Sequence, residues 1–223
     1  MKNSNIDLIV PFWKPIDWSS FDVVKKVKSQ IKPNKVGHAG SLDPFAEGVL
    51  VLCTGRKTKE SDKLMLLQKE YEGTIKLGVE TNTLDPTGTI CKDLDVPRLN
   101  SEKINNTLLQ FMGISYQIPP MFSALKRNGV PLYKLARKGI NIKLEPRPIN
   151  IYKIELLDYK NDEIKFKVSC SKGTYIRSLA RDIANKLNTC GHLIHLCRTK
   201  VGSYTKANAI RIENLNEWLS SVT

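Results

Sequence analysis

Residues 71–80 read Tyr-Glu-Gly-Thr-Ile-Lys-Leu-Gly-Val-Glu, and their side chains alternate in character. The odd-numbered positions hold Tyr, Gly, Ile, Leu and Val, whereas the even-numbered ones hold Glu, Thr and Lys apart from a single Gly. Successive side chains of a strand point to opposite faces. The stretch therefore predicts a strand with one buried face and one exposed face.

On both sides of this strand, short apolar runs are interleaved with helical periodicities. Further strands are expected at 6–12, 49–53, 149–157, 164–170 and 193–196, and helices at 19–31, 101–111, 174–187 and 214–219. The mixture predicts an α+β fold, with a mixed and mainly antiparallel sheet flanked by helices. The basic stretch 118–148 is bracketed by prolines, and we expect it to be an insertion in a single domain that spans residues 1–223.

The formal charge of +13, from 35 Lys and Arg against 22 Asp and Glu, is the main compositional signal. The charge is unevenly placed: residues 119–148 hold seven basic side chains and one acid, and residues 165–211 hold ten and one. Such an excess attracts phosphate backbones whatever their sequence. The sequence therefore predicts a basic face that binds nucleic acid.

The apolar runs, the N-terminal residues and the cysteines together indicate the cellular compartment. Membrane partners are not expected, because no apolar run approaches a membrane span and no signal-peptide core precedes Asp7 and Pro11. The five cysteines are odd in number and lack paired spacing, which is typical of reduced thiols. We therefore expect a cytoplasmic protein.

Residues 37–48, Gly-His-Ala-Gly-Ser-Leu-Asp-Pro-Phe-Ala-Glu-Gly, form the most informative loop. His38 and Asp43 lie together among glycines that fix an irregular backbone. Asp43 before Pro44 is also a good helix start, so capping and catalysis are both open on local grounds. The tripeptide Leu-Asp-Pro recurs at residues 84–86, and spacing alone does not choose between Asp43 and Asp85.

Three further candidates each have a structural alternative. The run Cys190-Gly-His192-Leu-Ile-His195-Leu-Cys197 has four potential zinc ligands, but two histidines three apart on a strand face opposite sides, so packing or RNA contact is favoured. Tyr71 is either a core residue or a platform on which a base stacks. Arg177, near a helix start where a cation is disfavoured, is either solvated or paired with a carboxylate or phosphate.

No phosphate-binding loop, dinucleotide fingerprint or nucleophile elbow is present. Four segments together resemble the TruB family of bacterial tRNA pseudouridine synthases, which modify the T-loop uridine at position 55. They are Lys14-Pro15 with Trp18-Ser19-Ser20, the loop 37–44 with Ala46, Gly48 and Leu50, Lys69-Glu70-Tyr71, and residues 171–177 (Ser-Lys-Gly-Thr-Tyr-Ile-Arg). Residues 117–126 and 147–149 in and around the insertion agree, and the resemblance runs from about residue 9 to 202.

The resemblance implies a pseudouridine synthase fold and a catalytic role for Asp43, not Asp85, as the nucleophile. Tyr71 would stack on the flipped-out base, and Arg177 would pair with Asp43. Whether the carboxylate attacks the sugar C1′ or the base C6, or acts through a glycal, stays open at this point.

The resemblance also implies the residues that contact RNA. His38 would enter the T-loop, Leu196 would line the pocket, and Lys14 with Pro15 would brace the active-site region. The insertion would be a thumb that grips RNA through Lys126, Arg137 and Arg147. The C-terminal RNA-binding domain common in the family is expected to be absent, because the sequence ends at Thr223.

Pseudouridine is an isomer of uridine, so the reaction implied needs no metal and no organic cofactor. The expected partner is the T-arm of tRNA, with no protein partner and a monomeric state. Two alternatives stay open: a non-catalytic RNA-binding or ribosome-associated protein, which explains the charge but not the loop 37–48, and a nuclease or hydrolase that uses Asp43 with a metal.

Overall fold

The computed structural model describes residues 7–31 and 35–222, and its contacts group into two compact units. Unit 1 contains the described residues up to Glu72 and those from Leu196 onward, and unit 2 contains residues 73–195. The chain leaves unit 1 within strand β4 (Lys69–Leu77) and returns to it within strand β12 (Gly191–Val201). Each unit is described by itself.

The sheet of unit 1 is centred on β3 (Glu47–Thr54), which pairs antiparallel with β1 (Ile9–Lys14) and β2 (Val36–His38). Residues Cys197 and Arg198 of β12 run parallel to the start of β3. The edge strands are β14 (Ile210–Arg211), parallel to β1, and β13 (Tyr204–Thr205), antiparallel to β12. Seven of the eight residues of β3 are buried, so this strand is the centre of the unit.

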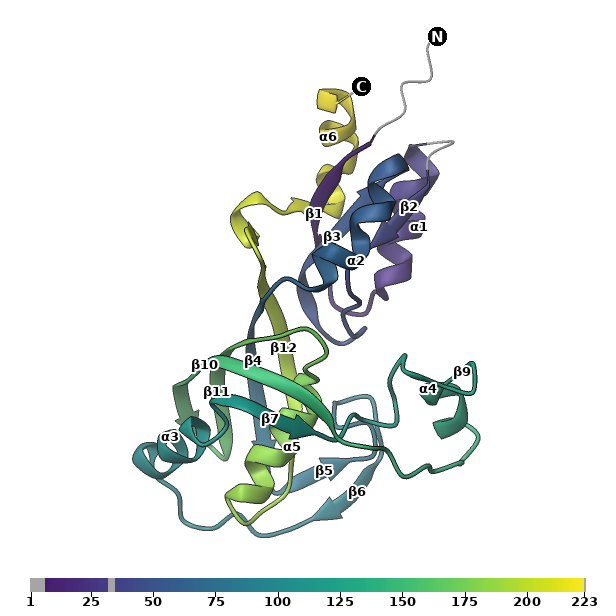
Figure 1. Ribbon diagram of the computed structural model, residues 1–223. Helices are drawn as coiled ribbons and strands as arrows, with labels where there is room; N and C mark the ends of the chain where they lie inside the picture. Colours follow the sequence, from purple (N-terminus) through teal and green to yellow (C-terminus); the bar gives the residue numbers. More distant parts are fainter. Residues whose placement is uncertain (1–6, 32–34, 223) are drawn as a thin grey trace. The chain divides into compact units, whose positions relative to one another are not determined.

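Helix α1 (Ser20–Gln30) begins at a capping box, in which the Ser19 hydroxyl accepts from the Asp22 amide while the Asp22 carboxylate accepts from Ser19. Its apolar stripe packs with one face of β1 and β3 and with α6 (Leu215–Val222) (Figure 1). Other buried residues of β1 and β3, namely Trp13, Val49 and Val51, belong to a second hydrophobic cluster. Shorter elements are η1 (Gly55–Glu60), α2 (Ser61–Met65), η2 (Lys206–Asn208) and η3 (Ile212–Asn214).

Unit 2 is built on the strand order β4-β11-β10-β7, with β11 (Glu163–Cys170), β10 (Arg147–Lys160) and β7 (Gly113–Gln117). The pairs β10–β11 and β10–β7 are antiparallel. Helix α3 (Ser101–Leu109) contacts β10, and α5 (Ile176–Lys186) contacts α3 (Figure 1). A separate hairpin joins β5 (Val79–Thr81) to β6 (Ile90–Asp93).

The stretch between β7 and β10 leaves the sheet of unit 2 as a separate small structure (Figure 1). It contains the hairpin β8 (Lys126–Arg127) and β9 (Val130–Pro131), followed at once by helix α4 (Leu132–Ala136). Its polypeptide begins and ends at neighbouring strands, since Gln117 pairs with Arg147. The geometry is that of an insertion, as the sequence predicts.

The predicted α+β class is confirmed: helices flank a mixed sheet in which the β1–β14 and β12–β3 pairings are parallel and the β1–β3, β10–β11 and β10–β7 pairings are antiparallel. The expected strand at 193–196 is longer, and the helix expected from Ser101 is capped by Asn100. No helix in the described ranges is long and apolar enough to cross a membrane. The expectation of a single domain over residues 1–223 stays a prediction.

Candidate active site

The loop that carries Asp43 joins β2 to β3. The amide of Ala46 donates to the carbonyl of Asp43 at 3.1 Å, which closes a turn, and β3 begins at the next residue. The helix that the sequence allowed after Asp43-Pro44 is therefore wrong. The physical reason is tertiary: the apolar run after the turn pairs with β1 along its length, and this pairing overrides the local capping preference.

Asp43 is half-buried, whereas its neighbours Leu42 and Phe45 are buried. Leu42 is fixed to helix α1, because its amide donates to the Ser20 hydroxyl at 2.8 Å and its carbonyl accepts from that hydroxyl at 3.2 Å. The loop therefore turns its apolar side chains inward and leaves the carboxylate partly open to solvent.

Lys14, at the end of β1, lies directly beside this loop. Its ammonium donates to the carbonyls of Pro15, Trp18 and Pro44 at 2.8, 2.5 and 3.2 Å, and the residue is fully buried. Burial lowers the pKa of Lys14 to about 8, although the negative charge of Asp43 opposes that shift. The position supports the bracing role that the resemblance implies, since the ammonium is engaged inside the protein.

Arg198 is a second buried cation at the loop, and the sequence analysis missed it. Its guanidinium donates to the carbonyls of Gly40, Ser41 and Val49, and only 2% of the residue is exposed. The only available signal was an arginine two residues after the strand expected at 193–196, in a chain with 26 lysines and only nine arginines.

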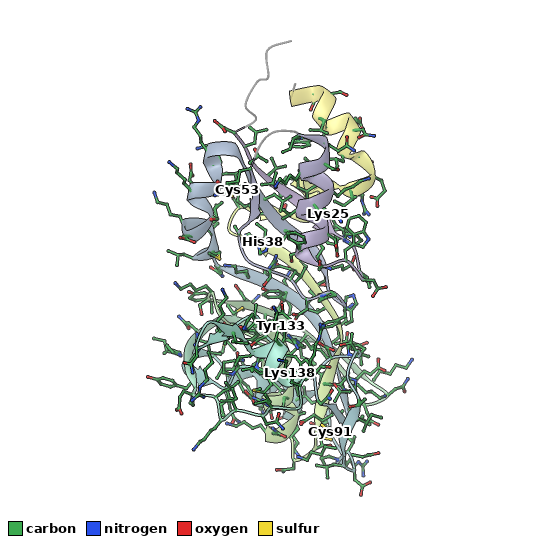
Figure 2. The ribbon with its side chains drawn as sticks, turned by 90° about the vertical axis from the view of Figure 1, so that its right-hand side faces the viewer. Lys25, His38, Cys53, Cys91, Tyr133 and Lys138 are labelled. Carbon is green, nitrogen blue, oxygen red and sulfur yellow. The ribbon has the colours of Figure 1, made fainter. Side chains whose placement is uncertain are left out.

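His38 is the last residue of β2, which pairs with β3. Figure 2 labels His38 together with Cys53 of β3. Its Nδ1 is buried and has no hydrogen-bond partner among the described residues. Burial, and secondly the charge of Arg198, lower the pKa of His38. Both effects favour the neutral form of the imidazole.

Tyr71 and Leu196 also belong to unit 1. Tyr71 lies on the buried face of β4 with 8% of its surface exposed, and Leu196 lies on β12 with 3% exposed. The alternation predicted from residues 71–80 is confirmed for β4, whose residues are alternately buried and half-buried.

Arg177 is the second residue of α5 in unit 2, and it is 4% exposed. Its Nη1 lies 3.3 Å from a carboxylate oxygen of Asp85, and the guanidinium donates to the carbonyls of Thr83 and Phe122 at 2.8 Å each. Of the two alternatives that the sequence left open for Arg177, solvated or paired, the structure has the paired one, with the carboxylate of Asp85 near the start of the helix. The further pairing of Arg177 with Asp43, which the resemblance implies, stays a prediction.

The two Leu-Asp-Pro tripeptides thus have different surroundings. Asp85 is buried and accepts from the hydroxyls of Thr83 and Thr87 at 2.7 and 2.6 Å and from the Thr87 amide at 3.0 Å. Asp43 is half-buried in a loop that two internal cations border. Asp85 is therefore buried among hydrogen-bond donors, whereas Asp43 is half-buried.

The predicted RNA-gripping side chains of the insertion are exposed: Lys126, Arg137 and Arg147. Arg137 also lies over the ring of Tyr133, 5.5 Å from its centre, and Figure 2 labels this tyrosine and Lys138. A cavity of about 160 Å³ in the insertion is bordered by Lys126, Arg127 and Arg147 and by apolar residues that include Leu132. Exposed cations of this kind are accessible to the phosphates of a nucleic acid.

The potential zinc ligands do not come together. Among the described residues, no group of three or more His, Cys, Asp or Glu side chains could hold a metal ion. The buried His192 contacts the carbonyl of Val79 through Nδ1 at 2.6 Å, whereas His195 is exposed, so the two histidines face opposite sides of β12 as expected. All five cysteines are free thiols.

Comparison with known proteins adds to this geometry. The model of the N-terminal domain of TruB family pseudouridylate synthases matches residues 28–176, and that of the tRNA pseudouridylate synthase B C-terminal domain matches residues 177–222. The chain is 48% identical over 220 residues to a curated protein named tRNA pseudouridine synthase B from Francisella philomiragia, covering 97% of this chain and 73% of that protein. The chain belongs to the TruB family of pseudouridylate synthases.

A second relative of the same name, from Clostridium tetani, is 46% identical and is covered over 72% of its length. Among solved structures, a Cbf5-Nop10-Gar1 complex matches with a TM-score of 0.73 and 26% identity over 96% of this chain. This chain spans 56% of the length of that solved chain. As a TruB family member the chain is an isomerase with the pseudouridine synthase fold, and a purely non-catalytic RNA-binding role is not favoured.

Proposed function

We propose that this chain isomerises uridine to pseudouridine in tRNA, at the T-loop uridine of position 55. The observation that carries the proposal is the placement of Asp43. In a chain of the pseudouridylate synthase family, a half-buried carboxylate stands in a loop bonded on one side to Arg198 and on the other to Lys14. The curated relatives named tRNA pseudouridine synthase B support tRNA as the substrate.

The reaction breaks the C1′–N1 glycosidic bond, turns the uracil, and joins C5 to C1′; N1 takes up one proton, C5 loses one to solvent, and the bond that the nucleophile formed is broken again before the product leaves. Asp43 acts as the nucleophile, and Arg177 and Tyr71 complete the catalytic group. Because no atoms or electrons are gained, we propose that neither a metal nor an organic cofactor takes part.

The target base must leave its stack, which costs a few kcal/mol. In this proposal His38 fills the vacated space in the T-loop, Tyr71 stacks on the uracil, and Leu196 lines the pocket. The exposed cations Lys126, Arg137 and Arg147 offset the cost through phosphate contacts. The chain acts as a monomer in the cytoplasm.

The direct test uses a T-arm stem-loop whose uridines carry tritium at C5. The wild-type chain is expected to release the label from one uridine per RNA, whereas Asp43→Asn should release none and still bind the RNA. Replacement of the position-55 uridine by cytidine in the same RNA should abolish release. Substantial label release by Asp43→Asn would reject the nucleophile, and release from the cytidine variant would reject the position.

The metal-dependent nuclease alternative is tested in the same reaction with EDTA. Undiminished label release together with intact RNA on a denaturing gel is expected. Cleavage of the RNA that EDTA abolishes would instead support a hydrolase.

A further inference from the structure

Arg198 places all three of its nitrogen groups on backbone carbonyls at the base of the loop that carries Asp43. Its Nε donates to Val49 at 2.7 Å, Nη1 to Ser41 at 3.0 Å and Nη2 to Gly40 at 3.2 Å. A guanidinium is planar and directs its donors in a fixed fork, so one rigid group sets the relative positions of three carbonyls. Two of these carbonyls lie only two and three residues before Asp43.

The backbone around Arg198 is adapted to this contact. Arg198 pairs in parallel with Gly48, where φ is +122°, a conformation that other residues rarely adopt. A Cβ atom at position 48 would lie 2.3 Å from the carbonyl oxygen of Arg198. Glycine at this position therefore lets β12 approach β3 closely enough for the guanidinium to reach the loop.

The loop is thus fixed on both sides of the carboxylate. Arg198 holds the carbonyls of Gly40 and Ser41 before Asp43, and Lys14 holds the carbonyl of Pro44 directly after it. Both cations are buried, so solvent does not compete for these hydrogen bonds. An internal loop with both flanks bonded has little freedom to move the side chain between them.

We propose that Arg198 is a positioning residue, which sets the place of the Asp43 carboxylate through the carbonyls of Gly40 and Ser41 without touching the substrate. The proposal rests on the proposed role of Asp43 as the nucleophile. A shift of about 1 Å in a reacting group costs on the order of a hundredfold in rate. Loss of the fork should therefore slow the chemical step while leaving RNA binding intact.

The test compares Arg198→Lys with the wild-type chain in single-turnover label release at saturating RNA. Lysine keeps the positive charge, but its three donors sit on a single nitrogen and not on a planar fork, so it does not hold the three carbonyls in the same arrangement. We expect the rate to fall by about 10- to 100-fold, with the RNA dissociation constant within twofold of wild type. Hydrogen exchange at the loop amides of residues 40–46 should become faster.

The stability control is Val27→Ala, a buried α1 residue on the face of the sheet that packs against α6. At a temperature where both variants are folded, Val27→Ala should keep the wild-type rate despite its lower melting temperature. A wild-type rate for Arg198→Lys would overturn the proposal. So would an equal rate loss in Val27→Ala, or weaker RNA binding with an unchanged saturated rate.

Two measurements keep the proposal testable if Arg198→Lys does not fold. Arg198→Gln retains one amide group as a donor. It is expected to lower the single-turnover rate in the same way while leaving the RNA dissociation constant unchanged. In the wild-type chain, the guanidinium protons of Arg198 should exchange slowly with solvent in nuclear magnetic resonance spectra, and exchange at the rate of an exposed arginine would overturn the proposal. Activity retained by Asp43→Asn would reject the nucleophile instead, while the exchange results would still report on Arg198.

Discussion

The guanidinium of Arg177 lies 3.3 Å from the carboxylate of Asp85, and both side chains are less than one-tenth exposed. Asp85 sits in the turn after β5, and Arg177 sits in the first turn of α5, so the pair joins two elements of unit 2 that are more than 90 residues apart in sequence. The repeated Leu-Asp-Pro tripeptide at residues 84–86 therefore supports the arginine that the family resemblance assigns to catalysis.

Asp85→Asn should destabilise the protein and slow catalysis, because it removes a carboxylate from beside a buried guanidinium. Breaking a buried pair by removing one partner costs about 3–5 kcal/mol. We expect a fall of that order in the free energy of unfolding, measured by urea denaturation. The rate of label release should fall by at least tenfold at saturating RNA.

A double-mutant cycle with Arg177→Met gives the control for this pair. The two substitutions together should cost less than the sum of their separate effects, with a coupling energy of about 1–3 kcal/mol. Strict additivity would show that the 3.3 Å contact contributes nothing to stability.

The pH dependence of activity should carry the signature of Lys14. Burial lowers its pKa to about 8, so the ammonium beside the loop is protonated below pH 8 and is lost above it. We expect the single-turnover rate to fall as the pH rises through about 8, whereas Lys14→Arg, whose guanidinium stays charged, should show no such fall.

The lowered pKa of Lys14 also makes the free energy of unfolding depend on pH. In the unfolded chain Lys14 keeps its proton up to its ordinary pKa of 10.5, so between pH 8 and 10.5 the unfolded state binds more protons than the folded state. The contribution of Lys14 to the free energy of unfolding therefore increases as the pH rises through this range. The gain is at most about 1.4 kcal/mol per pH unit. Lys14→Met should lack this rise in urea denaturation, and an identical pH dependence in both proteins would refute the lowered pKa.

Gly48→Ala should be severely destabilising. A positive φ at a residue other than glycine costs about 1–3 kcal/mol, and overpacking against the backbone of Arg198 costs about as much again. We expect the free energy of unfolding to fall by at least about 3 kcal/mol. The matched control is Gly37→Ala, at the other end of the loop, where an added Cβ would meet nothing within 4 Å. Equal stability losses in the two variants would contradict the close approach.

Charge reversal of the exposed Lys126 and Arg137 should weaken RNA binding and reduce its dependence on salt. Removing one cation from a phosphate lowers the slope of log affinity against log salt by about 0.7–0.9. Filter binding of the T-arm stem-loop over a range of salt concentrations measures this slope. Reversal of Lys25 and Lys103, exposed lysines on α1 and α3, is the control for net charge. If both pairs of reversals change the slope equally, the insertion has no special role.

Sequence periodicity was sufficient for the longer strands and helices, because they bury a single regular face, whereas short strands such as β2, β7 and β14 were not anticipated. The alternation in β4 and the capping box of α1 are local signals, and the structure agrees with both. The helix start that Asp43-Pro44 allowed does not form, because a cap is a local preference worth about 1 kcal/mol. Pairing of the following apolar run with β1 outweighs it.

The sequence by itself determined the α+β class, the basic insertion and, through its family resemblance, the candidates Asp43, His38, Tyr71 and Arg177. Lys14 was also a candidate through that resemblance, but only the tertiary structure decided that Arg198 lies at the loop and that Asp85 is a partner of Arg177. Periodicity records which face of an element is buried, whereas a buried charge is placed by carbonyls and carboxylates far away in sequence. Such long-range contacts leave no local pattern to read.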